Sequence, residues 1–265
     1  MNPFRLIYDF FFGMYEYREF LRQSVQRDLR RRYRRAFLGY IWSMLQPLMM
    51  MAVLTVAFAK IMNRTSDDYA VFLFAGMIPF SYFKMTVMGA MGAVRQNAQI
   101  TDQIPVPRFI FPTSYGISNL VDLIFSILPL LLVMLVLGHP FHKTLLLFPI
   151  VLVPLFLCTM GLAFIFAVSN VFFEDTEHLV GVLLQALYFL SPVLYAREQL
   201  PDWVLKYVEV FNPMFIIVEL HRSIFYDGLP INWMLYGQSV AIGLVLLAFG
   251  IWVFKRAEKK FIYFL

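Results

Sequence analysis

Six long apolar stretches constrain this chain more strongly than any other feature of its sequence. They lie at 37–59, 69–94, 109–137, 144–173, 179–196 and 229–254. A helix needs about 20 mostly apolar residues to cross the roughly 30 Å of hydrocarbon in a bilayer. Hydrophobic residues make up 60% of the chain and charged residues 15%, so a soluble globule would expose far too much apolar surface. The sequence therefore predicts an all-α, polytopic membrane protein with six transmembrane helices.

The distribution of Lys and Arg predicts how these spans are oriented. An even number of spans places both termini on one side of the membrane. That side carries 15 of the 22 Lys and Arg residues, whereas the loops on the opposite side carry six. Because cytoplasmic loops are enriched in Lys and Arg, both termini are predicted to be cytoplasmic. The net charge of +5 then reflects topology and contacts with anionic membrane lipids, and nucleic acid is not expected as a partner.

Residues 1–36 are predicted to form an N-terminal segment of their own, followed by a membrane domain at 37–265. Apolar side chains recur at helical spacing, at Phe10, Met14, Tyr17, Leu21 and Val25. A basic run follows at Arg30, Arg31, Arg32, Arg34 and Arg35. This pattern predicts an amphipathic helix in the cytoplasmic interface, with apolar side chains in the acyl boundary and Arg at lipid phosphates. The helix either anchors the topology or also guides an anionic lipid-linked substrate.

The stretch 197–228, between the last two predicted spans, is not an ordinary loop. It is too polar to cross a bilayer and too apolar to be fully solvated, and Pro201 and Pro213 divide it. Short re-entrant or interfacial helices fit this composition if protein or a cavity covers their ends. From residue chemistry alone, an outer cap and an outer gate are equally supported. The candidate gate residues are Trp203, Asn212, Pro213, Glu219 and Arg222.

The sequence lacks the motifs of the main catalytic and nucleotide-binding classes. The stretch 138–144 comes nearest to a phosphate-binding loop but has no Gly before Lys143. The His residues form no HExxH pair, and the lone Cys158 can form neither an internal disulfide nor a thiolate cluster. We therefore expect no catalytic residue, no metal site and no cofactor bound by this chain.

Several short strings, spread over most of the chain in a fixed order, resemble one family of membrane proteins. The first span begins with FLGYIWSMLQPL at 37–48, and FAGMIPF follows at 74–80. FLSPVLY occupies 189–195, FNPM occupies 211–214, and ELHR occupies 219–222. In this combination the chain is similar to the membrane subunits of ABC-2 type polysaccharide exporters, which move O-antigen, capsule or teichoic acid chains.

This resemblance implies a homodimer in the bacterial inner membrane, with each copy bound to a separate ATP-binding subunit. ATP and Mg would bind to the two copies of that partner, and the substrate would be a glycan on an undecaprenyl-type lipid. In the family, a short helix between spans two and three docks on the ATPase, and it matches 95–104 here. Its polar residues are Arg95, Gln96, Asn97, Gln99 and Asp102. The resemblance also implies that 197–228 forms the outer gate.

Aromatic side chains within the predicted spans are candidates for a polysaccharide path. Sugar rings present C–H faces that stack on aromatic rings without requiring one hydroxyl pattern, so a long chain can slide. Binding along such a conduit has to be weak and repeated. The candidates are Trp42, Phe58, Tyr82, Phe83, Tyr188, Phe189 and Tyr195. The alternative is that these rings are buried in helix packing or lie in interfacial aromatic belts.

Lys84 and Asp122 are the two charged residues within the predicted spans. Each lies about ten residues from the cytoplasmic end of its span, so a rise of about 1.5 Å per residue places them at matching depth. A lone charge at mid-bilayer costs about 2.5–3.5 kcal/mol on insertion scales, which predicts an intramembrane ion pair. Otherwise Lys84 extends to the interface, or each charge faces a water-filled path.

The leading function is export of a lipid-linked polysaccharide, driven by ATP on a partner subunit. The alternatives are an ABC-2 exporter of a small amphiphile or drug, a polytopic membrane enzyme acting on lipid-linked sugars, and a passive channel. An enzyme would need several carboxylates or a metal facing a cavity, and Asp122 alone is a poor basis for that. A passive channel leaves the polar loop at 95–104 unexplained.

Overall fold

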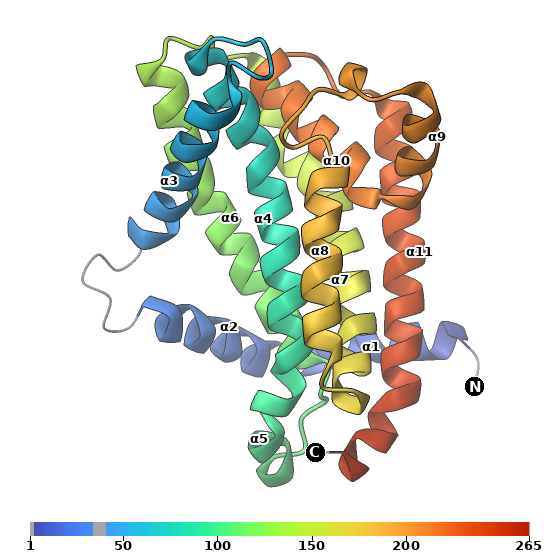
Figure 1. Cartoon of the computed structure of the whole chain (residues 1–265). Coiled ribbons are helices and arrows are strands. Elements are labelled where there is room, and N and C mark those ends of the chain that lie inside the picture. Colours follow the sequence, from blue (N-terminus) through green and yellow to red (C-terminus); the bar gives the residue numbers. More distant parts are fainter. Residues whose placement is uncertain (1–2, 34–40, 265) are drawn as a thin grey trace.

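A computed structural model describes residues 3–33 and 41–264, and every regular element within them is helical (Figure 1). This confirms the predicted all-α class. The longer elements are α1 (Pro3–Glu16), α2 (Arg18–Tyr33), α3 (Ile41–Phe58), α4 (Ser66–Gln96), α5 (Ala98–Gln103), α6 (Ile110–Val136), α7 (Phe148–Phe172), α8 (Thr176–Leu190), α9 (Asp202–Phe211), α10 (Pro213–Arg222) and α11 (Trp233–Ala257). The short turns are η1 (Lys143–Leu147), η2 (Arg197–Gln199), η3 (Ser223–Asp227) and η4 (Glu258–Tyr263).

Four of the described helices are long and apolar enough to cross a membrane. They are α4, α6, α7 together with the preceding η1, and α11 together with the following η4. The bounds of the first three agree within a few residues with the spans predicted at 69–94, 109–137 and 144–173, whereas the fourth begins at Trp233 and continues to Tyr263, beyond the end of the stretch predicted at 229–254. The most buried of them is α4, which packs against both α6 and α7. The described residues therefore form a multi-pass helical membrane protein.

The other two predicted spans correspond to shorter apolar helices, α3 and α8. The helix α8 has 15 residues, which at a rise of about 1.5 Å per residue cover roughly 22 Å. It ends at Leu190 because Pro192 disfavours a helical conformation at the residue before it, and Ser191 is accordingly extended, with ψ 147°. The count of six spans therefore stays a prediction.

Two ends of the bundle can be told apart in Figure 1. The helix α5 and the C-terminus lie at one end, called the α5 end below, and α9 lies near the other, called the α9 end. The helices α1 and α2 run across the bundle, on the side of its middle that is nearer to the α5 end (Figure 1).

The helices α7 and α11 make the most extensive contact in the bundle. Glycines bring their backbones together, since a Cβ on Gly250 would lie only 2.4 Å from the carbonyl oxygen of Gly161. A Cβ on Gly161 would in turn lie 2.5 Å from the carbonyl carbon of Leu246. Small residues at helix interfaces allow such close approach inside membranes, where packing replaces the hydrophobic effect.

The N-terminal segment differs from the single helix predicted for it, because α1 and α2 are separated at Tyr17. The apolar stripe was expected to enter the acyl boundary, but it packs against the bundle instead. Phe10 and Leu21 are buried there, with Phe109 and Phe164 of the bundle in the same apolar cluster. A second stripe of α1 remains exposed, at Tyr8, Phe11, Phe12 and Tyr15.

The predicted breaks at Pro201 and Pro213 are confirmed, because α9 begins directly after Pro201 and α10 begins at Pro213. The two helices differ in burial. The helix α10 packs against α4, α7 and α11, and from Met214 to Arg222 all but one of its side chains are buried. On α9, the aromatic side chains Trp203 and Phe211 are exposed.

Candidate gating, coupling and translocation sites

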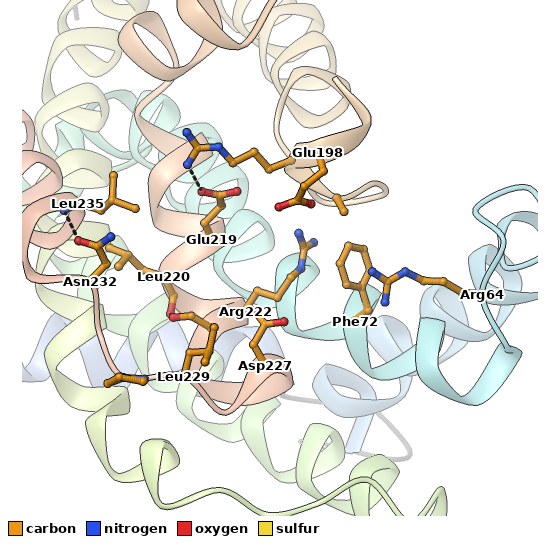
Figure 2. A pocket seen from close by; sticks show the side chains of 14 residues that line it. Arg64, Phe72, Glu198, Glu219, Leu220, Arg222, Asp227, Leu229, Asn232 and Leu235 are labelled. Atoms are coloured by element: carbon orange, nitrogen blue, oxygen red, sulfur yellow. Dashed lines mark hydrogen bonds and ion pairs between the residues drawn. The ribbon is translucent and has the colours of Figure 1, made fainter. Parts of the chain in front are cut away.

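Arg222 lies at the centre of the polar segment at the α9 end (Figure 2). Its side chain is buried, and its guanidinium donates to three carbonyl oxygens of the turn that follows α8. These belong to Pro192, Val193 at 3.2 Å and Tyr195 at 3.5 Å. The guanidinium also lies 3.6 Å from the ring centroid of Phe72. Arg222 therefore joins α10 to both α4 and the end of α8.

Carboxylates surround this guanidinium and oppose the cost of its burial. Burial lowers the pKa of Arg222 to about 10, while Asp227 and Glu219 act in the opposite direction, so the group is charged at neutral pH. Burial also raises the pKa of Glu219, against the attraction of Arg197, and that of Asp227, against the attraction of Arg222. Arg197 pairs with Glu219 at 3.3 Å and with Glu209. The segment is thus held together by several charges of both signs.

A second arginine at the α9 end belongs to a cluster that the sequence reasoning missed. Arg64 pairs with Asp68 at 2.9 Å and donates to the hydroxyl of Tyr226, which itself donates to Asp68. Figure 2 shows the ring of Phe72 between the guanidinium groups of Arg64 and Arg222, and that of Arg64 lies 4.2 Å from the ring centroid. The spacing of four between Arg64 and Asp68 was visible in the sequence, but the contact with Tyr226 spans 162 residues.

The remaining candidate gate residues separate into two places. Asn212 begins α10, because its Oδ1 accepts from the backbone N–H of Met214 while Pro213 occupies the first turn. Its Nδ2 donates to the hydroxyl of Ser191 at 2.9 Å, which ties α10 to the end of α8. Trp203 lies on the exposed face of α9. The structure therefore brings Asn212 and Arg222 onto the same turn and leaves Trp203 outside it.

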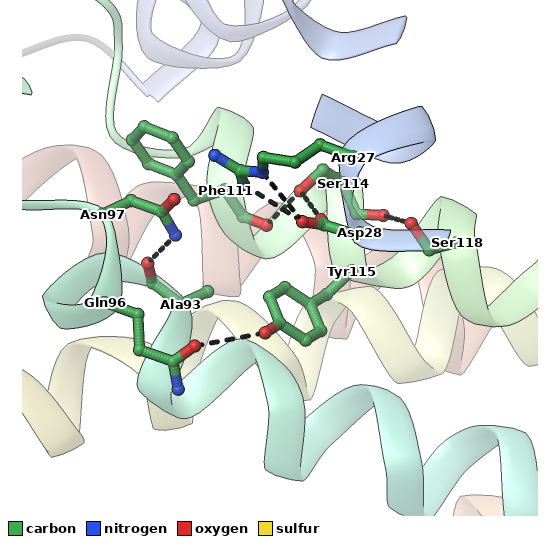
Figure 3. Close-up of polar contacts among 9 residues, drawn as sticks. All are labelled: Arg27, Asp28, Ala93, Gln96, Asn97, Phe111, Ser114, Tyr115 and Ser118. Atoms are coloured by element: carbon green, nitrogen blue, oxygen red, sulfur yellow. Dashed lines mark hydrogen bonds and ion pairs between the residues drawn. The ribbon is translucent and has the colours of Figure 1, made fainter. Parts of the chain in front are cut away.

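At the α5 end, the predicted coupling segment forms a helix that is interrupted at Asn97. The helix α4 ends at Gln96 and α5 follows at Ala98–Gln103. Three of the polar residues, Arg95, Gln96 and Asn97, have partners within the chain. Arg95 pairs with Glu174 and donates to the carbonyl of Val171, and Asn97 is buried with its Nδ2 donating to the carbonyl of Ala93 (Figure 3). The amide oxygen of Gln96 accepts from the hydroxyl of Tyr115 at 3.2 Å (Figure 3). The side chains of Gln96 and Gln99 are exposed, and Asp102 lies near the end of α5.

The basic helix α2 packs on α6 through charged and polar groups. Asp28 receives hydrogen bonds from Arg27 and from the hydroxyl of Ser114 at 2.9 Å (Figure 3). Arg32 forms an ion pair with Asp122. Of the predicted basic run, Arg30 and Arg31 are exposed, while Arg34 and Arg35 fall outside the described residues.

The structure does not bring Lys84 and Asp122 together as the predicted ion pair. Lys84 donates to the amide oxygen of Gln185 on α8 at 3.3 Å, and Asp122 pairs with Arg32 instead. The prediction from matching positions along the two spans did not take into account that α2 packs against α6 and brings an arginine to the carboxylate.

The seven candidate path aromatics occupy different environments. Tyr82 and Phe83 are buried within the bundle, and the hydroxyl of Tyr82 donates to the carbonyl of Gly116 at 3.3 Å. Trp42 and Phe189 are exposed, at 44% and 55%. Three are partly buried, namely Phe58, Tyr188 and Tyr195. In a single chain, the seven rings therefore do not share one surface.

The fold and these sites define a multi-pass helical membrane protein, with a charged segment closing one end of the bundle and a short helix at the other. The family described as the ABC-2 type transporter matches residues 19–226, and the chain belongs to this family.

Individual relatives are similar over nearly their full length. The chain is 32% identical over 254 residues to the O-antigen export system permease protein RfbA of Myxococcus xanthus, covering 94% of this chain and 96% of that protein. It is 26% identical over 241 residues to the protein of the same name from Klebsiella pneumoniae, covering 89% and 91%. It is 28% identical over 239 residues to the polysialic acid transport protein KpsM of Escherichia coli, covering 88% and 91%.

Proposed function

We propose that the chain is the membrane subunit of an ATP-driven exporter of a lipid-linked polysaccharide of the O-antigen, capsule or teichoic acid type. The observation that carries the proposal is the similarity over nearly the whole chain to relatives named for export of O-antigen and transport of polysialic acid. These names refer to chemically different glycans. The shared function is therefore polysaccharide export, with a glycan attached to an undecaprenyl-type lipid as the substrate.

In this proposal the chain crosses the bacterial inner membrane six times, with both termini in the cytoplasm. The helices α3 and α8 serve as the first and fifth spans, and the turn after α8 completes the short fifth one. The α5 end is then cytoplasmic, and α1 and α2 lie near the cytoplasmic surface. Their crosswise orientation and the exposed aromatic stripe of α1 support this placement, because aromatic side chains favour the membrane interface.

A homodimer provides the path. The rings of Tyr82 and Phe83 fill the interior of one bundle, so a wide hydrated conduit has no room there. Two copies related by a twofold axis can enclose a path between them. The exposed apolar faces of α3 and α8 are the surfaces proposed for that arrangement, and Trp42 and Phe189 lie on these two helices. Their side chains include Met50, Val53 and Val56 on α3, and Leu179, Val182 and Leu183 on α8.

The energy comes from ATP and Mg bound to two copies of a separate ATP-binding subunit, because this chain lacks a phosphate-binding loop. The chain itself binds no cofactor and carries no catalytic residue in this proposal. The helix α5 docks on the partner, with Gln96 and Gln99 exposed for that contact. Arg95 and Asn97 hold α5 in position from within the chain.

Purification from the native host in lipid nanodiscs tests the proposal. We expect mass spectrometry to find an ATP-binding subunit in equal amount and a lipid-linked glycan in the same particle. A folded dimer that contains neither, under conditions that preserve other transporter complexes of the host, would contradict the proposal.

A further inference from the structure

A polar cavity of about 300 Å³ opens at the α9 end, between α4, η2, α10, η3 and the start of α11 (Figure 2). Three arginines and three carboxylates line it, together with the ring of Phe72 and the amide of Asn232. The charged residues are Arg64, Arg197, Arg222, Glu198, Glu219 and Asp227. Their formal charges cancel, although the cavity is strongly polar.

Some of these groups are already paired, and others are available to a ligand. Arg197 pairs with Glu219. Glu198 and Asp227 have no ion-pair partner within 4.0 Å among the described residues. Arg222 also lines the cavity, and its Nε is buried without a hydrogen-bond partner among the described residues, although its terminal nitrogens donate to carbonyls. A buried donor without a partner is costly, so the guanidinium of this lining residue keeps hydrogen-bonding capacity that the described residues do not use.

The chemistry of these free groups selects the kind of ligand. A phosphate or carboxylate would be repelled by Glu198 and Asp227, and a metal cation would be repelled by Arg222. A neutral hydroxyl group can accept from a guanidinium and donate to a carboxylate at the same time. Several hydroxyls on one ring would satisfy Arg222, Glu198, Asp227 and the amide of Asn232 together.

We propose that this cavity binds one neutral saccharide unit, through hydroxyl groups that bridge Arg222 to Glu198 and Asp227. Its volume is at the small end of ligand pockets, which fits one sugar ring rather than an oligosaccharide. The inference rests on the proposed function, because the exported glycan is the source of that sugar unit. The site would hold a unit of the glycan at the α9 end, beside the turn that Arg222 fixes.

Ligand-observed NMR on the purified protein in lipid nanodiscs tests the site. The probes are the methyl glycosides of glucose, galactose, mannose and rhamnose, with inorganic phosphate and Ca²⁺ offered separately. We expect at least one glycoside to bind saturably, and neither ion to bind at this site. Glu198→Ala and Asp227→Ala should each weaken that binding about tenfold, because a hydrogen bond to a charged group is lost. The control Glu177→Ala removes an exposed carboxylate near the α5 end and should leave binding unchanged.

Three results would overturn the inference: no glycoside binds up to its solubility limit, binding survives in both variants, or phosphate or Ca²⁺ binds and is lost in the same variants. Thermal unfolding of each variant, matched to the wild type, separates loss of binding from loss of fold. Export is measured independently in cells by deleting the gene. If deletion abolishes surface glycan while the purified protein binds no glycoside, the site is wrong and the proposed function stands. If deletion leaves surface glycan intact, the function itself fails.

Discussion

The contact between α7 and α11 makes a quantitative prediction about Gly250. In Gly250→Ala the new Cβ would lie 2.4 Å from the carbonyl oxygen of Gly161, so the helices must separate by about 1 Å. Forcing an extra carbon into a filled contact costs about 1–3 kcal/mol. The better helix propensity of Ala returns about 0.5–1 kcal/mol of that. We therefore expect a net loss of roughly 1–2 kcal/mol in the free energy of unfolding.

Gly237→Ala is the matched control, because it lies on the same helix and its Cβ would meet nothing within 4 Å. It should leave stability unchanged or increase it slightly. Both variants are compared by SDS-induced unfolding in mixed micelles, followed by tryptophan fluorescence. If Gly250→Ala is as stable as Gly237→Ala, the two backbones are not in close contact, and the packing described here is incorrect.

Three further predictions concern charged groups and the α5 end. In a double-mutant cycle on the free energy of unfolding, Arg32→Ala and Asp122→Ala should show a coupling energy of about 0.5–3 kcal/mol. The effects of Lys84→Met and Asp122→Ala should be additive. The reverse result would support the Lys84–Asp122 ion pair predicted from the sequence. Asp227→Asn should raise the melting temperature at pH 7.5, because burial raises the pKa of this carboxyl and makes its charged form unfavourable in the folded state. That gain should disappear as the pH falls below the ordinary pKa of Asp, where the wild-type group is also neutral, and a gain that persists there would have another cause. Gln99→Cys, at an exposed position of α5, should cross-link to the ATP-binding subunit in the intact complex. If this cysteine fails to cross-link while a cysteine elsewhere in the chain succeeds, the ATP-binding subunit docks at that other position and not on α5.

Hydropathy was sufficient to locate the long helices, because length and apolarity are local properties of the sequence. It could not distinguish helix from turn inside an apolar run, and this is why the predicted stretch 179–196 extended past Leu190. The signal was present in Pro192, which disfavours a helical conformation at Ser191. The turn that results presents the carbonyl groups that Arg222 binds.

Sequence periodicity also revealed the apolar stripe containing Phe10 and Leu21, but not what covers it. An amphipathic pattern is the same whether the apolar face meets lipid or protein. Here α1 and α2 pack on the bundle, and this placement also supplies Arg32 to Asp122. Contacts between residues 90 positions apart depend on how the helices are arranged, so no local pattern could predict them.

The candidate sites were predictable to different degrees. Asn212 and Pro213 were recognisable because they begin a helix by local rules. The cluster of Arg64, Asp68 and Tyr226 was not, because it forms only when η3 folds back onto the beginning of α4.

The most direct test of polysaccharide export is deletion of the gene in its native host, followed by quantification of polysaccharide on the cell surface and inside the cell. The proposed function predicts that surface glycan disappears, that lipid-linked glycan accumulates inside, and that the wild-type gene restores export. Unchanged surface glycan in the deletion strain, with no internal accumulation, would contradict the assignment of this chain as a polysaccharide export subunit.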